Sequence, residues 1–174
     1  MITCDHIVIR SAELDDAEGL WRLYNPDKPR TFQLGPNLEL RTPTIDELKT
    51  LLDDPERKMG EIYIVEDLEG LVLGCAIMQS AGSNTPYSEA MFAFNDEAIY
   101  NTPAADEAFA FVRKQAFTIK KRRKLIAHCL DTEPTYRAFL IRHGYTSDGI
   151  QRELIYAGGQ YHDLESLSLF PETA

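Results

Sequence analysis

One long amphipathic segment, preceded and followed by strand-sized apolar segments, restricts the fold of this chain more than any other feature. Between Pro103 and Lys120 apolar residues recur at helical spacing, which predicts a helix with one apolar face. Such a face must be buried against a second layer, and the neighbouring strands supply it. The residues that form this face are Ala105, Ala108, Phe109, Val112, Ala116 and Ile119.

The other elements follow from local signals. Residues 44–47 read Thr-Ile-Asp-Glu, a capping box that starts a helix, and residues 67–70 read Asp-Leu-Glu-Gly, a hairpin turn between two strands. The predicted class is α/β, with a central mixed, mostly antiparallel sheet flanked by helices. Strands are expected at 6–10, 61–66, 71–79, 89–94, 125–130, 153–157 and 164–170, and helices at 11–24, 44–52, 103–120 and 135–143.

Composition narrows the class of protein. A formal net charge of -10 argues against nucleic acid as a partner, because phosphate binding needs a basic surface. The apolar segments are too short to span a membrane, and no secretory leader precedes the first strand. Cys4, Cys75 and Cys129 are widely separated, which favours a reducing compartment and no metal site. We expect one cytoplasmic domain over residues 1–174.

The segment from His143 to Phe170 carries the most specific pattern and reads HGYTSDGIQRELIYAGGQYHDLESLSLF. It resembles the RimJ/RimL-like branch of the GNAT family of N-acetyltransferases, and the opening of the chain agrees more loosely. The resemblance implies the GNAT fold and transfer of an acetyl group from acetyl-CoA to a primary amine, on a small molecule or a peptide N-terminus. The matching positions are Gly144, Tyr145, Gly149, Arg152, Gly159, Tyr161 and Asp163.

The same resemblance implies a set of site residues. Glu89 stands where related enzymes place a general base, within reach of the amine directly or through one water. A solvated glutamate at a strand edge is the alternative. Tyr100 is a candidate for stacking on the cofactor, with a packed loop tyrosine as its alternative. The backbone of Ala93, Phe94 and Asn95 would face the pantetheine arm, and the pyrophosphate loop corresponds to Tyr100, Asn101, Thr102, Ala104 and Ala105.

That loop departs from the family pattern. Pro103 replaces the central glycine and has no N–H to donate, and all four charged residues between 95 and 111 are acidic. Thr102 and Pro103 are instead good residues for starting a helix that satisfies its own first turn. Two functions therefore stay open: an acetyltransferase, and a catalytically inactive GNAT-fold binding or regulatory module.

Several further positions bear on function, and some of them allow either a functional or a structural interpretation. Leu140 stands where many relatives have a tyrosine that protonates the thiolate, and Glu133 stands near the place of an asparagine. His162 invites a catalytic interpretation, although polar residues are common there in this branch. The basic run from Lys120 to Lys124 suits either an anionic partner or the solvated end of a helix. The sequence leaves open whether the terminal strands pair within one chain or in a homodimer.

Overall fold

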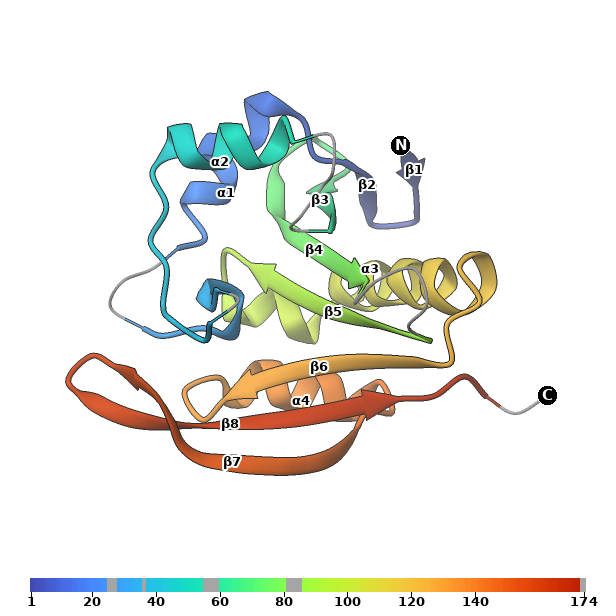
Figure 1. Ribbon diagram of the computed structural model, residues 1–174. Coiled ribbons are helices and arrows are strands. Elements are labelled where there is room, and N and C mark those ends of the chain that lie inside the picture. The colour runs from blue at the N-terminus through green and yellow to red at the C-terminus, as the bar shows by residue number, and fades with distance from the viewer. Residues whose placement is uncertain (25–27, 36, 55–59, 81–85, 173–174) are drawn as a thin grey trace.

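A computed structural model describes residues 1–24, 28–35, 37–54, 60–80 and 86–172. Its centre is one eight-stranded sheet in the order β1-β2-β3-β4-β5-β6-β8-β7 (Figure 1). All neighbouring strands are antiparallel except β5 and β6, which are parallel. The strands are β1 (Ile2–Thr3), β2 (Ile7–Ser11), β3 (Glu61–Asp67), β4 (Val72–Ser80), β5 (Tyr87–Phe94), β6 (Lys124–Leu130), β7 (Thr146–Ala157) and β8 (Gln160–Leu169).

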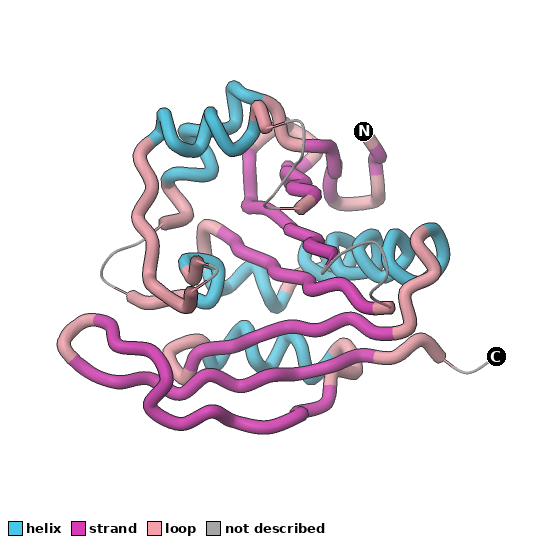
Figure 2. The backbone as a smooth tube through the Cα atoms, viewed as in Figure 1, coloured by secondary structure: helices cyan, strands magenta, loops and turns pink. Residues whose placement is uncertain are grey.

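Helices cover both faces of the sheet, as the tube view shows (Figure 2). Alternation along each strand divides the core: Ala76 packs with the α3 and α4 side chains, whereas its neighbour Cys75 packs with those of α1 and α2. Among the described residues no helix is both long and apolar enough to cross a membrane. The helical elements are η1 (Leu14–Asp16), α1 (Ala17–Trp21), η2 (Thr31–Gln33), α2 (Ile45–Leu52), η3 (Glu97–Asn101), α3 (Pro103–Arg113), η4 (Lys114–Ile119) and α4 (Pro134–Arg142).

The predicted α/β class and mixed, mostly antiparallel sheet are confirmed. The Thr44–Glu47 capping box forms as expected, with the backbone N–H of Glu47 donating to Thr44 Oγ1. Gly144 has a φ of 90° directly after α4, as a helix-terminating glycine requires. The turn proposed at 82–86 falls largely outside the described residues.

Four predicted elements differ from the structure in their bounds or in their helix type. The helix expected at 11–24 begins later, because Ser11 still pairs with Tyr63 in the sheet. The helix expected at 103–120 turns π-helical from Lys114. The strand expected at 153–157 starts at Thr146, within a polar segment without alternation, and the strand expected at 164–170 starts at Gln160 and ends at Leu169. The two-residue strand β1 was not predicted.

Candidate active site

The parallel strands β5 and β6 stay together only briefly. Their register runs from Tyr87 opposite Lys124 to Glu89 opposite Ile126, and beyond Glu89 the two strands separate (Figure 1). We call the region between 90–94 of β5 and 127–130 of β6 the wedge. Its donor side is the sheet face covered by α3 and α4, where the resemblance places the cofactor. Its acceptor side is the opposite face, which carries α1 and α2.

Glu89 lies at the narrow end of the wedge, on the acceptor side. Its carboxylate Oε1 accepts a hydrogen bond from His128 Nδ1 over 2.8 Å, and the two side chains are 30% and 29% exposed. Among the described residues no hydrogen bond reaches the second carboxylate oxygen. The carboxylate is thus oriented by the imidazole and still accessible, as a proton acceptor must be. Sequence reasoning named Glu89 as a candidate and did not connect it with His128, because only the parallel register brings the two side chains together.

The backbone groups predicted for the pantetheine arm face two ways. Asn95 N–H donates to Leu73 O of β4 over 2.9 Å, and Ala93 shares this direction by alternation. Phe94 is the one of the three whose backbone N–H and C=O point into the wedge. Two residues earlier, Phe92 C=O also points there, and it accepts a hydrogen bond from Tyr100 Oη at 2.8 Å. The hydroxyl of this protein's own tyrosine therefore occupies part of the edge that a pantetheine arm would use.

The ring of Tyr100 lies in the core. It is 2% exposed and packs within 5.0–5.4 Å, between ring centroids, of Phe94, Tyr136 and Phe139. Burial raises the pKa of its hydroxyl well above the usual value. The structure gives this residue the packing role, and no face of the ring is open to a cofactor.

The first turn of α3 satisfies itself. Thr102 C=O accepts from the N–H groups of Ala105 and Asp106 at 3.2 and 3.4 Å, and Pro103 has no N–H. Thr102 takes the capping position with extended backbone, but its hydroxyl donates back to Ile99 C=O at 2.7 Å. Ala104 is the remaining residue of the predicted loop in this turn. These groups do not form the cradle of free N–H groups that a pyrophosphate needs.

A cation does reach this loop, from a helix that sequence reasoning did not connect with it. Arg142 of α4 donates to Tyr100 C=O at 2.8 Å, to Asp106 Oδ1 at 2.7 Å and to Asn101 Oδ1 at 3.4 Å. His143 Nε2 lies 2.9 Å from the same Asp106 oxygen. Burial alone would raise the pKa of Asp106, but these two donors outweigh it and lower the pKa. This Arg142 clasp joins α4 to the start of α3, so these residues present no preformed cradle for a pyrophosphate.

A segment without a recognisable motif closes the acceptor side at the wide end of the wedge. Glu133 Oε2 accepts from Thr31 N–H at 2.8 Å, from Leu130 N–H at 3.2 Å and from the Thr31 hydroxyl. Thr132 Oγ1 donates to Pro29 C=O at 2.7 Å. The side chain of Glu133 is buried, and burial raises its pKa. Glu133, near the place where many relatives have asparagine, therefore attaches the η2 segment to the end of β6.

The remaining polar residues singled out in the sequence are buried or hydrogen-bonded within the fold. His162 is buried, with Nδ1 2.8 Å from Asp131 Oδ1 and Nε2 3.3 Å from Ala157 C=O. Cys129 is buried in the core on the donor side, and burial raises the pKa of its thiol. Asp163 accepts a hydrogen bond from Glu153 N–H at 2.8 Å, where β7 departs from regular register. His162 and Asp163 hold the terminal hairpin outside the wedge, and Cys129 is a packed core residue on its donor side.

Comparison with known proteins shows the family to which the chain belongs. A profile described as an acetyltransferase (GNAT) domain matches residues 9–165, so the chain belongs to the GNAT acetyltransferase family. No curated protein matches it significantly. A GNAT-family acetyltransferase from Bacillus anthracis is similar in structure, with a TM-score of 0.74, 20% identity, and 99% of each chain covered.

A spermidine/spermine N-acetyltransferase from Vibrio cholerae, solved in mutant forms, is also similar. The TM-score is 0.75 at 17% identity, covering 94% of this chain and 93% of that one. A dodecameric form of the Vibrio spermidine N-acetyltransferase gives a TM-score of 0.76, also at 17% identity and over the same shares of the two chains. At these identities the likeness concerns the fold.

Proposed function

We propose that this protein is an amine N-acetyltransferase of the RimJ/RimL-like branch, with Glu89 as the group that removes the proton from the amine. The observation that carries this proposal is the Glu89–His128 pair, partly exposed at the point where β5 and β6 separate. We also propose that residues 1–174 act as one cytoplasmic domain, since the first strand and the terminal hairpin belong to one sheet.

The chemistry expected of these residues is simple. When bound, acetyl-CoA supplies the acetyl group as a thioester. The free carboxylate oxygen of Glu89 takes a proton from the ammonium form of the acceptor, directly or through one water, and His128 Nδ1–H holds the carboxylate in place. An acidic chain with a net charge of -10 also attracts cationic acceptors. The acceptor classes proposed are small-molecule amines and peptide N-termini.

The name of the Vibrio enzyme suggests polyamines as the first acceptors to test. The assay would measure acetylation of spermidine, and of a peptide with a free N-terminus, at saturating acetyl-CoA. Turnover of either acceptor that rises with enzyme concentration supports the proposal. A folded protein that acetylates neither, at any pH between 6 and 9, contradicts it for these acceptors.

A second function is favoured by a specific observation, the packed donor side. Tyr100, Phe139 and the Arg142 clasp fill the space that the resemblance assigns to the cofactor. This arrangement suits a GNAT-fold binding or regulatory module that has lost acetyl-CoA. Calorimetric titration with acetyl-CoA, with desulfo-CoA as a check on the thiol, separates the two functions. Micromolar binding supports the enzyme, whereas no heat at millimolar cofactor supports the module.

Assembly is a further part of the proposal. The terminal strands β7 and β8 pair with each other within the chain, which leaves the sheet-edge strand β7 as the candidate for a homodimer interface, and one structural neighbour is described as dodecameric. Light scattering at several protein concentrations would measure the mass. A mass of one chain at all concentrations contradicts the homodimer.

A further inference from the structure

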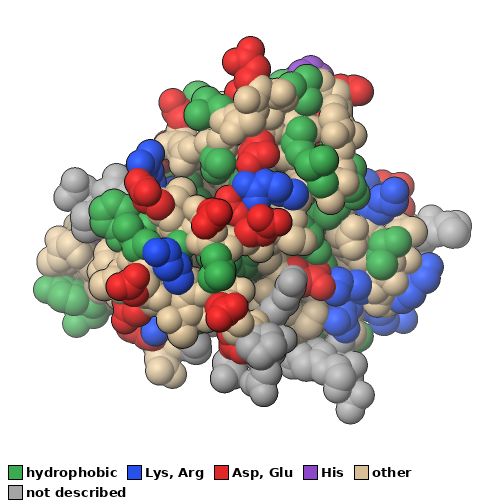
Figure 3. Space-filling view, turned by 90° about the horizontal axis from the view of Figure 1, so that it is seen from above, with side chains coloured by type: hydrophobic (Ala, Val, Ile, Leu, Met, Phe, Trp, Pro, Cys, Tyr) green, Lys and Arg blue, Asp and Glu red, His purple; other side chains and the backbone are tan. Residues whose placement is uncertain are grey.

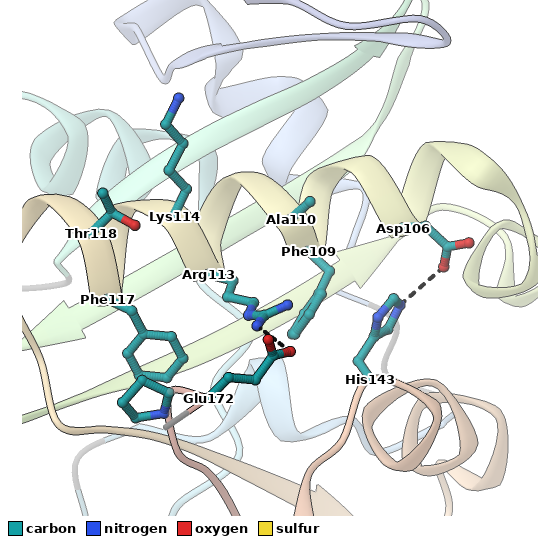
Figure 4. A pocket seen from close by; sticks show the side chains of 10 residues that line it. Asp106, Phe109, Ala110, Arg113, Lys114, Phe117, Thr118, His143 and Glu172 are labelled. Carbon is teal, nitrogen blue, oxygen red and sulfur yellow. Dashed lines mark hydrogen bonds and ion pairs between the residues drawn. The ribbon is translucent and has the colours of Figure 1, made fainter. Parts of the chain in front are cut away.

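A second concave site lies along α3 and its π-helical continuation η4. It is a groove of about 490 Å³, a volume within the range of small-molecule sites. One wall is the outer face of α3 and η4, and the other is formed by His143 and by Pro171 and Glu172 of the C-terminal segment (Figure 4). Glu89 faces the opposite side of the sheet, so this groove, the α3–tail groove, is separate from the proposed proton acceptor.

The apolar part of the groove is aromatic. Phe109 and Phe117 line it about two turns apart on the helical wall, and the His143 ring stacks on Phe109 at a centroid distance of 4.1 Å, which leaves Phe109 4% exposed. Phe117 belongs to η4, a six-residue π-helix. π-Helical turns are rare and recur at functional sites, because the wider turn redirects side chains. Flat apolar groups would find complementary surfaces here.

The polar centre of the groove is a guanidinium group. Arg113 reaches between the two phenylalanine rings and donates to Glu172 Oε1 at 2.7 Å (Figure 4). Arg113 is 41% exposed and Glu172 is 85% exposed. Ion pairs this exposed contribute little and are readily exchanged. The carboxylate of Glu172 shows that an anionic group can reach the Arg113 guanidinium in this groove, and it is exposed enough to be exchanged for another anion.

The segment along this groove is rich in cations, although Lys120 and Lys124 pair with Glu61 and Asp148 and the groove lining also includes Asp106 and Glu172. Residues 113–124 contain seven of the 18 lysines and arginines, and no acidic residue occurs between 108 and 130. Lys114 forms no ion pair with another described residue and lies at the rim of the groove. Lysine and arginine side chains gather at the right edge of Figure 3, over the end of the molecule where η4 and the C-terminus lie. This local positive potential would attract an anion.

We propose that the α3–tail groove binds a small aromatic anion, a flat ring that carries one carboxylate or phosphate. The ring would lie against Phe117, the part-exposed ring of the groove, beside the buried Phe109–His143 stack, and the anionic group would take a bidentate hydrogen bond from Arg113 in place of Glu172. The C-terminal segment then acts as a competing internal ligand. This inference does not depend on the proposed acetyl transfer.

Calorimetry with four probes tests the two halves of the ligand. Phenyl phosphate and 3-phenylpropionate carry ring and charge, benzyl alcohol carries only the ring, and inorganic phosphate only the charge. We expect at least one of the two aromatic anions to bind with a dissociation constant below about 1 mM, and both partial probes to bind at least about tenfold more weakly. The tighter anion identifies the head group. Equal affinity for inorganic phosphate and phenyl phosphate would overturn the aromatic half.

Three variants locate the site. Arg113→Gln should weaken binding of the aromatic anion about tenfold or more, because a charged hydrogen-bond donor is lost. Glu172→Gln should strengthen it about threefold, because the internal competitor is removed. Arg22→Gln, on a distant and exposed arginine of the α1 region, should change nothing. Unchanged affinity in Arg113→Gln overturns the site, and so does the absence of binding in both wild type and Glu172→Gln.

Discussion

The two sides of the wedge are built from the same pair of strands and yet differ in kind. The donor side is packed with aromatic rings from β5, η3 and α4 and fastened by the Arg142 clasp. At its narrow end the acceptor side keeps a carboxylate about one-third exposed and held by one imidazole. The comparison shows that one pair of strands can carry a tightly packed aromatic face and, on the other face, an accessible carboxylate held by one imidazole.

The largest effect should come from removing an aromatic ring on the donor side. Phe139 is 0% exposed and contacts the rings of Phe92, Tyr100 and Phe109. Phe139→Ala should lower the free energy of unfolding by about 3–5 kcal/mol, measured by denaturant titration. Ile141→Ala, on the exposed face of the same helix, should cost under about 1 kcal/mol. A small cost at Phe139 would mean that the donor side is loosely packed and the contrast between the sides is mistaken.

The acceptor side should respond in activity and not in stability. Glu89→Gln removes the proton acceptor but keeps the size of the side chain, so the rate of amine acetylation should fall about 100-fold or more. The free energy of unfolding should change by less than about 1 kcal/mol, because the side chain is part-exposed. Glu18→Gln, an exposed carboxylate on α1, serves as the matched control. Equal rates in the two variants would remove Glu89 from the mechanism.

The closure of the acceptor side can be weakened at Thr31. Thr31→Val removes the hydroxyl that contacts Glu133 and accepts from Leu130 N–H, and should cost about 1–2 kcal/mol of unfolding free energy. Thr50→Val, on the exposed face of α2, should cost less than half of that. A cost no larger than the control would show that the η2 segment is not fastened by this contact.

The cost of Thr31→Val should also depend on pH. Because burial raises the folded-state pKa of Glu133, the folded protein keeps this proton at pH values where the unfolded chain has released it. The stabilisation from this proton is complete below the pKa of Glu133 in the unfolded chain, about 4.3, and it is lost as pH rises through the pKa in the folded protein. Thr31→Val removes a hydrogen-bond donor to Glu133, and this donor matters most when the Glu133 carboxylate is ionised. The variant should therefore lose more unfolding free energy at neutral pH than at pH 4. Chemical denaturation at both pH values measures the difference.

The smallest effect on stability should come from the Arg142 clasp. Its side chain is 41% exposed, so Arg142→Gln should lower the unfolding free energy by less than about 1 kcal/mol. If the clasp alone excludes the cofactor, acetyl-CoA binding measured by calorimetry should strengthen in this variant and not in Arg22→Gln. Absence of acetyl-CoA binding in both would assign the exclusion to the packed rings instead.

Much of the fold could be predicted because it depends on local signals. The capping box at Thr44 and the apolar helix face from Ala105 to Ala116 act within a few residues and appear as expected, whereas Ile119, predicted on the same face, is 59% exposed. The polar first half of β7 could not be predicted, since its residues are exposed and carry no alternation. The π-helical turn of η4 also lacks a local signature.

The candidate site was predictable only in part, because its contacts are long-range. Glu89 was identified from its place in the family pattern, but its partner His128 lies 39 residues away across the parallel pair. Arg142 approaches the α3 loop from α4, 42 residues from Tyr100. The absence of a phosphate cradle was visible at Pro103, whereas the rings that fill the space were visible only once β5, η3 and α4 were brought together.

The tie between Thr31 and Glu133 has a consequence for the order in which the protein is made. The two residues are 102 positions apart, so at a synthesis rate of 5–20 residues per second the η2 segment waits roughly 5–20 s for its partner. During that interval Thr31, buried in the finished protein, lacks the carboxylate that accepts its backbone N–H and its hydroxyl. Closure of the wedge must therefore be a late event on the ribosome, and a chain arrested before Glu133 should expose this segment to proteases.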